Sequence, residues 1–90
     1  MTFKDEVESI CDNIAYMLVD KNEAYGNSAL NPVRVFSKAS ALEQLYVRID
    51  DKLSRLQKGH EYPGDDTIND LIGYLVLLKI KLKTERNKNE

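Results

Sequence analysis

The sequence predicts an all-α fold, a short bundle of three or four helices that self-association completes. Apolar residues recur at steps of three and four along three segments, and clusters of Gly, Pro, Asn and Ser separate these segments. The third segment is apolar around most of its circumference, which indicates burial on several sides. The 90 residues are expected to form one helical domain over 1–90.

The first helix is expected over about 3–25. Thr2 and Asp5 are typical of an N-cap and its acidic partner three residues later. Gly26 suits the left-handed position that follows a helix. The apolar face of this helix consists of Phe3, Val7, Ile10, Ile14, Met17 and Leu18.

The second helix is expected over about 40–58, because Ser40 and Glu43 fit the Ser-x-x-Glu capping pattern. Its apolar stripe consists of Leu42, Leu45, Ile49, Leu53 and Leu56. The connection before it, over 27–39, is long enough to be functional. It contains an apolar run that we expect to pack against the helices, namely Pro32, Val33, Val35 and Phe36. A turn rich in glycine and proline is expected over 59–64.

The third helix is expected over about 66–83, with Asp65 or Asp66 as its N-cap. Apolar residues cover one face and much of the rest: Ile68, Leu71, Ile72, Tyr74, Leu75, Val76, Leu77, Leu78, Ile80 and Leu82. Two other helices of so short a chain cannot cover this surface, so we expect a homodimer or a higher oligomer. The polar segment 84–90 is expected to fray.

Charge and composition argue against several classes of function. The net charge of −2 argues against a protein that binds duplex nucleic acid. The longest apolar stretch, 71–82, contains Lys79 and Lys81 and is too short to span a bilayer. The N-terminal residues do not resemble a signal peptide, so we expect no membrane partner and a cytoplasmic location. Cys11 and His60 are single, which excludes an internal disulfide and a paired-His metal motif; we expect a core thiol and an ordinary loop residue.

Several cations are spaced so that they can hold phosphate groups. Arginine binds phosphate with two parallel hydrogen bonds and lysine adds a point charge, while a tyrosine ring can stack on a base. The alternative for each cation is a solvated charged surface. The candidate nucleotide-binding residues are Lys21, Tyr25, Asn27, Arg48, Lys52 and Arg55.

The acidic residues allow a second interpretation. Asp66 and Asp70 are four residues apart on one helix face, roughly 6 Å from each other, and such a pair can share Mg²⁺. Asp66 has the alternative role of a helix cap and Glu43 that of a capping partner. Asp51 has the alternative role of an ion pair on the helix surface.

Three motifs carry a resemblance to a known family. They are 21–28 (Lys-Asn-Glu-Ala-Tyr-Gly-Asn-Ser), 48–56 (Arg-Ile-Asp-Asp-Lys-Leu-Ser-Arg-Leu) and 66–75 (Asp-Thr-Ile-Asn-Asp-Leu-Ile-Gly-Tyr-Leu). The chain resembles the small helical proteins of phages and bacteria that are associated with nucleotide modification. More distantly, it is similar to the MazG-like all-α nucleotide pyrophosphohydrolases. The resemblance covers about residues 15–82.

The MazG-like resemblance implies a helical dimer or tetramer that binds Mg²⁺ through carboxylates from two helices. It also implies the cleavage of nucleoside triphosphates to monophosphate and pyrophosphate, with metal activating the attacking water. Asp70 and Asp66 match the second acidic cluster of that pattern, with a spacing of four in place of three. The first cluster, Glu-Glu-x-x-Glu, has no equivalent in this sequence.

Three functions are therefore weighed. The leading hypothesis is a phage-type protein that holds a nucleotide at a subunit interface without turnover and without a cofactor, with Asp70 accepting from the ligand or orienting an arginine. The alternative is a Mg²⁺-dependent pyrophosphohydrolase whose metal ligands are Glu43, Asp51, Asp66 and Asp70. A third hypothesis is a purely structural interaction protein. The base of the nucleotide, and whether the nucleotide is linear or cyclic, stay open.

Overall fold

The chain is all-helical in the computed structural model, which describes residues 1–59, 63–64 and 66–88. Three helices follow one another, α1 (Phe3–Tyr25), α2 (Ala41–Lys58) and α3 (Thr67–Lys88). No strand occurs in these ranges, so the prediction of an all-α fold is confirmed there. The predicted turn over 59–64 and the alternative cap Asp65 lie partly or wholly outside the described residues, as does His60.

Local hydrogen bonds fix the ends of α1 as the sequence predicts. The Asp5 N–H donates to the Thr2 hydroxyl oxygen at 3.1 Å, and the Thr2 N–H donates to the Asp5 carboxylate at 3.2 Å. These two bonds satisfy backbone donors that the first turn of a helix leaves without partners. Gly26 ends the helix with φ 62° and ψ 39°, a conformation that costs glycine little.

The same kind of local chemistry begins α2 and α3. The Ser40 hydroxyl oxygen accepts from the Glu43 N–H at 3.1 Å, and Gly59 ends α2 with φ 73°. The Asp66 carboxylate accepts from the Asn69 N–H at 3.0 Å, so Asp66 caps α3. Both starts agree with the sequence within one residue.

The C-terminal end of α3 differs from the prediction. The helix continues to Lys88, so the expectation of a frayed polar tail from residue 84 is wrong up to that point. Lys81 and Glu85 form an ion pair at 3.4 Å, and the Thr84 hydroxyl donates to the Ile80 carbonyl at 3.0 Å. Lysine, glutamate and arginine are good helix formers even where nothing packs on them.

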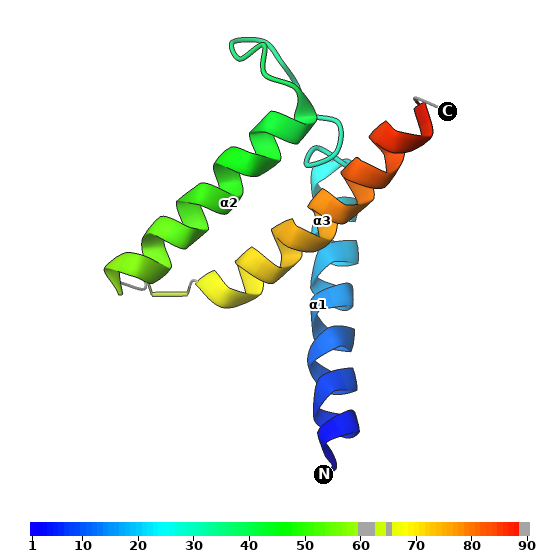
Figure 1. Cartoon of the computed structure of the whole chain (residues 1–90), viewed down its shortest axis with the longest axis vertical. Helices are drawn as coiled ribbons and strands as arrows, with labels where there is room; N and C mark the ends of the chain where they lie inside the picture. The colour runs from blue at the N-terminus through cyan, green and yellow to red at the C-terminus, as the bar shows by residue number, and fades with distance from the viewer. Residues whose placement is uncertain (60–62, 65, 89–90) are drawn as a thin grey trace.

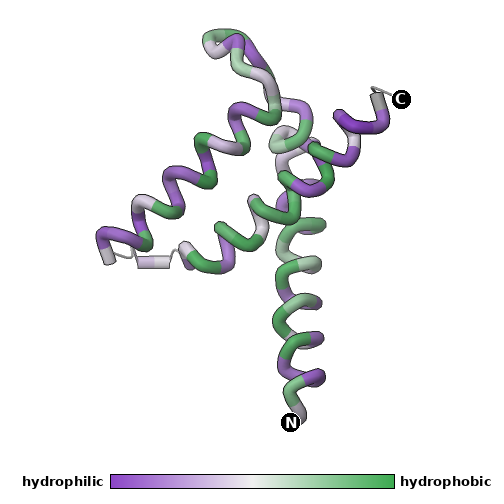
Figure 2. The backbone as a smooth tube through the Cα atoms, in the orientation of Figure 1, coloured by the Kyte–Doolittle hydropathy of each residue, from purple (hydrophilic) through white to green (hydrophobic). Residues whose placement is uncertain are grey.

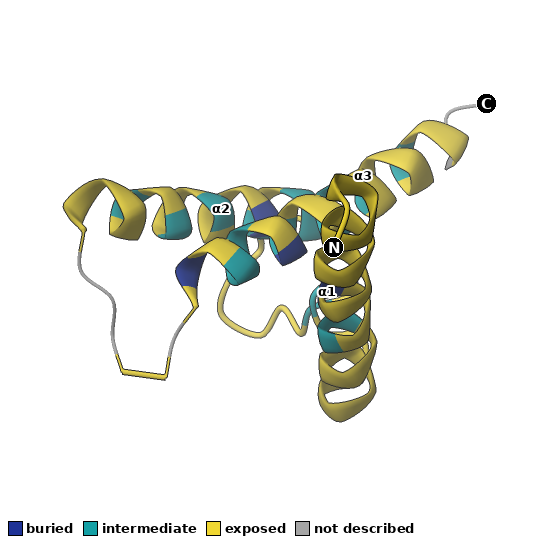
Figure 3. Cartoon of the chain, turned by 90° about the horizontal axis from the view of Figure 1, so that it is seen from below, coloured by how far each residue is buried: buried dark blue, intermediate teal, exposed yellow. Residues whose placement is uncertain are grey.

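The three helices form an open arrangement (Figures 1 and 3). The helices α2 and α3 run antiparallel and pack along each other, while α1 crosses α3 over a short stretch. Among the described residues, the backbones of α1 and α2 do not come close to each other. Closure of a bundle by self-association therefore stays a prediction.

Gly73 lies where α1 crosses α3. A Cβ atom built on Gly73 would lie 3.1 Å from Leu18 Cδ2 and 3.2 Å from Met17 Cε, closer than ordinary packing. The missing side chain therefore lets the two helices approach. Ile14 on α1 and Leu45 on α2 are the apolar residues that the described part of the chain buries.

Much apolar surface stays exposed, and this overturns two expectations (Figures 2 and 3). The expected packing of the connection is wrong for Val35 and the almost fully exposed Phe36, whereas Pro32 is half-buried as expected. Cys11 is exposed and is not a core thiol, because none of the described residues packs on the first half of α1. None of the described helices is long and apolar enough to cross a membrane.

Candidate functional site

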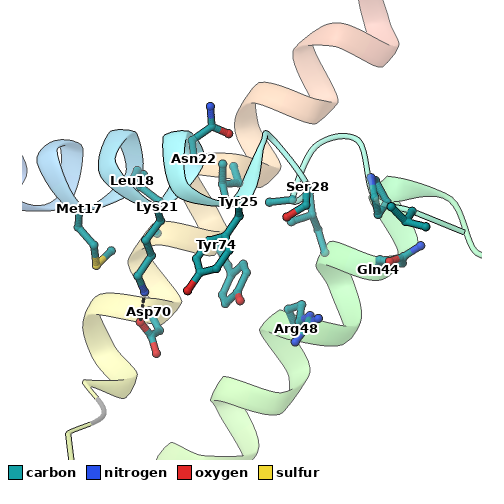
Figure 4. A pocket seen from close by; sticks show the side chains of 16 residues that line it. Met17, Leu18, Lys21, Asn22, Tyr25, Ser28, Gln44, Arg48, Asp70 and Tyr74 are labelled. Atoms are coloured by element: carbon teal, nitrogen blue, oxygen red, sulfur yellow. Dashed lines mark ion pairs between the residues drawn. The ribbon is translucent and has the colours of Figure 1, made fainter.

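A cavity of about 530 Å³ lies where all three helices and the connection meet (Figure 4). Its walls come from the C-terminal half of α1, the connection, the first half of α2 and the N-terminal half of α3. The polar and aromatic residues in this lining are Lys21, Asn22, Tyr25, Ser28, Gln44, Arg48, Asp70 and Tyr74. All three helices and the connection contribute residues to this lining.

Asp70 is the acidic residue of the lining, and two lysines share its carboxylate. Lys21 Nζ lies 3.6 Å from Oδ1, and Lys52 Nζ lies 3.1 Å from Oδ2. The carboxylate thus joins α1, α2 and α3 at one point. Its partners in the structure are lysines, in place of the arginine that the sequence analysis offered as one alternative.

The lining has an excess of positive charge at neutral pH. Lys21 and Arg48 line the cavity, and Lys52 lies next to it because it pairs with Asp70. The site therefore contains three cations and one carboxylate. In the part of the chain that the structure describes, the Arg48 guanidinium forms no ion pair. A cavity whose walls carry more cations than carboxylates attracts anions, because its shape focuses the electrostatic field.

Aromatic and amide groups complete the walls. Tyr25 from α1 and Tyr74 from α3 point into the cavity (Figure 4). The Gln44 amide nitrogen donates to the Ala39 carbonyl at 3.0 Å, which fixes this side chain against the connection and leaves its amide oxygen as an acceptor. Asn22 adds a second amide to the lining.

The structure brings together some of the predicted nucleotide-binding residues. Lys21, Tyr25 and Arg48 line the cavity, and Lys52 reaches its edge. Asn27 is not among the lining residues. It has φ 63°, and its carbonyl accepts from two backbone N–H groups further along, so it shapes the turn after α1. Arg55 also lies outside the lining, in the last turn of α2.

The four carboxylates predicted as metal ligands are spread over the structure. Glu43 lies in the first turn of α2, Asp51 is exposed further along that helix, and Asp66 caps α3. Only Asp70 among them lines the cavity. Within the described ranges, no three histidine, cysteine or acidic residues gather closely enough to hold a metal ion.

Sequence reasoning missed several lining residues. Gln44 lies one helical turn before Arg48, and Tyr74 lies one turn after Asp70, so each follows from the helical period once its neighbour is chosen. Ser28 and Val33 come from the connection, whose path no periodicity predicts. Comparisons of the chain with protein families, with curated proteins and with solved structures found no match.

Proposed function

We propose that this protein binds a nucleotide in the cavity between its three helices and holds it without turning it over. The observation that carries the proposal is the charge of the lining. Arg48 has no acidic partner among the described residues, and the one acid, Asp70, is already shared by two lysines. A phosphorylated ligand supplies the negative charge that this arrangement lacks.

The chemistry of the cations supports a phosphate at this site. A guanidinium donates two parallel hydrogen bonds to a phosphate, which fixes the orientation of the ligand as well as attracting it. Lys21 has an exposed side chain and is the weaker partner of Asp70, at 3.6 Å. It can therefore turn from Asp70 to a phosphate oxygen at little cost, since exposed ion pairs contribute little.

The remaining walls support an aromatic base. Tyr25 and Tyr74 offer rings for stacking, and the amides of Asn22 and Gln44 offer donors and acceptors for base edges. The volume of about 530 Å³ falls within the roughly 300–1,000 Å³ typical of small-molecule sites. The resemblance of the motifs at 21–28 and 48–56 points to the same class of ligand.

Hydrolysis of the nucleotide is the less supported alternative. A pyrophosphohydrolase that uses Mg²⁺ needs several carboxylates around the phosphates, and the lining contains Asp70 alone. Release of pyrophosphate from a nucleoside triphosphate, and its loss in Asp70→Asn, would favour the enzyme over the binding protein.

A thermal-shift screen of linear and cyclic nucleotides, with and without Mg²⁺, tests the proposal first. A nucleotide present at about 100 times its dissociation constant should stabilise the fold by ~2.7 kcal/mol and raise the melting temperature. A screen in which no nucleotide raises that temperature would favour the structural interaction protein.

The best nucleotide from the screen then tests the role of Arg48. We expect Arg48→Ala to weaken binding in calorimetry by at least about tenfold, because a charge-assisted hydrogen bond contributes roughly 1.5–3 kcal/mol. Arg86→Ala is the matched control, since Arg86 is exposed in the C-terminal part of α3 and does not line the cavity. Equal affinities of the two variants would contradict the proposed site.

A further inference from the structure

The single chain exposes far more surface than a protein of its mass normally does. Its accessible surface is 7273 Å², whereas a folded monomer of 10.3 kDa is expected to expose about 5,400 Å². Its radius of gyration is 14.8 Å, compared with about 12 Å for a compact domain of this length. The excess of roughly 1,900 Å² is larger than the ~800 Å² that each partner loses in a standard interface.

Part of this surface is the first half of α1, residues 3–13, here called the α1 arm. Phe3 is 82% exposed and Ile10 is 56% exposed, although both lie on the apolar face of the helix with Val7. The same face continues into Ile14 and Met17, which lie at the crossing with α3. The arm therefore extends an established packing face for about three turns beyond its last neighbour (Figure 1).

The other part is the C-terminal half of α3, residues 76–87, here called the α3 arm. At about 100° per residue, Ile80 lies on the same face as Gly73 and Leu77, the face that α1 crosses. Ile80 and its neighbour Val76 are exposed, because α1 leaves α3 at Gly73. Each arm therefore extends one side of the α1–α3 interface into a stretch where its apolar residues are exposed.

The two arms also have opposite charges. The α1 arm carries four acidic residues against Lys4, and the α3 arm carries four basic residues against Glu85. Pairing two α1 arms, or two α3 arms, would bring like charges together. Pairing an α1 arm with an α3 arm brings opposite charges together. The charges therefore select the partner that the apolar faces require.

We propose that two copies of this chain form a symmetric dimer in which the α1 arm of each copy packs along the α3 arm of the other. A two-fold axis makes this exchange reciprocal, so both pairs of arms are covered at once. The self-association expected from the sequence would then use the apolar faces of the two arms. It does not depend on the nucleotide, because the α1 arm contributes no residue to the cavity lining and the α3 arm contributes Leu77 alone.

Sedimentation equilibrium of the full chain tests the proposal directly. We expect twice the 10.3 kDa mass of one chain. In Ile10→Glu the dimer dissociation constant should rise by at least about tenfold, because a charged side chain would replace an apolar one in the interface and lose its hydration. Val19→Glu is the matched control, since Val19 is 60% exposed on the opposite face of α1 and should dimerise normally.

Exchanging the charges identifies which helices pair. One variant combines Glu6→Lys with Asp12→Lys on the α1 arm, and the other combines Lys79→Glu with Lys83→Glu on the α3 arm. Each variant alone should dimerise weakly, because its own two arms then no longer carry opposite charges, and an equimolar mixture should restore the dimer. Restoration in the mixture also shows that the variants are folded.

Three results would overturn the proposal. The first is a wild-type chain that stays a monomer at high concentration. The second is normal dimerisation of Ile10→Glu, which would place the contact elsewhere. The third is normal dimerisation of each charge variant alone. This result is expected if the α1 arms pair with each other and the α3 arms pair with each other.

Discussion

At the scale of single residues, Asp70 connects α1 and α2, whose backbones do not approach each other, to α3. Its carboxylate on α3 forms ion pairs with Lys21 on α1 and with Lys52 on α2. The two pairs differ in strength, because the Lys52 side chain is 14% exposed and that of Lys21 is 54% exposed. Water screens the second pair much more than the first.

This difference gives a stability prediction. We expect Lys52→Met to lower the free energy of unfolding by about 1–2 kcal/mol, since it breaks a largely buried pair, although Lys21 still partners Asp70. Lys21→Met should lower it by less than about 0.5 kcal/mol. Urea denaturation of both variants measures the two values, and equal losses would show that Asp70 does not act as described.

The sequence predicted the site residue by residue with uneven success. The sequence selects Lys21, Tyr25 and Arg48 by the chemistry of their side chains, and the structure places all three in the lining of one cavity. Asn27 was assigned to the ligand, but its left-handed φ of 63° marks a turn residue. Gln44 was missed, because its position in the lining depends on the path of the connection against α2.

At the scale of helices, the boundaries were the most predictable feature. Caps such as Thr2 and Ser40 act through hydrogen bonds to residues three positions away, so a short stretch of sequence determines them. The C-terminal end of α3 lies beyond the predicted one, because a polar composition does not by itself indicate fraying. A helix can continue past its apolar residues where ion pairs such as Lys81–Glu85 support it.

The crossing of α1 and α3 was not predictable from periodicity, and Gly73 determines it. We expect Gly73→Leu to lower the free energy of unfolding by roughly 1–3 kcal/mol, because the larger side chain would overlap Leu18 and Met17. Gly73→Ala should stay nearly neutral. Its Cβ meets only flexible side-chain ends, and alanine improves helix propensity by about 1 kcal/mol.

The two Gly73 variants should also differ in ligand binding. Displacement of α1 in Gly73→Leu would move Lys21 and Tyr25 away from Arg48, so nucleotide affinity should fall together with stability. Chemical denaturation and calorimetry measure the two effects separately. A fully stable Gly73→Leu variant with unchanged affinity would contradict the described crossing.

At the scale of the whole molecule, the three helices form an open arrangement with a cavity where they meet. The three helices meet around Asp70 and Gly73, and the arms of α1 and α3 project away from that point (Figure 1). The sequence predicted that α3 is too apolar for a single chain to cover, and its exposed apolar residues agree with that reasoning. The location of the cavity within one chain could not be predicted, because it depends on the angle at which α1 crosses α3.

The most direct test of the central claim is a nuclear magnetic resonance titration of the ¹⁵N-labelled protein with the nucleotide that stabilises it most. Binding in the cavity predicts saturable shifts of the backbone amides that surround it, foremost Asn22, Gln44 and Gly73. Shifts confined to the basic residues 76–87, or the absence of any saturable shift, would contradict the account.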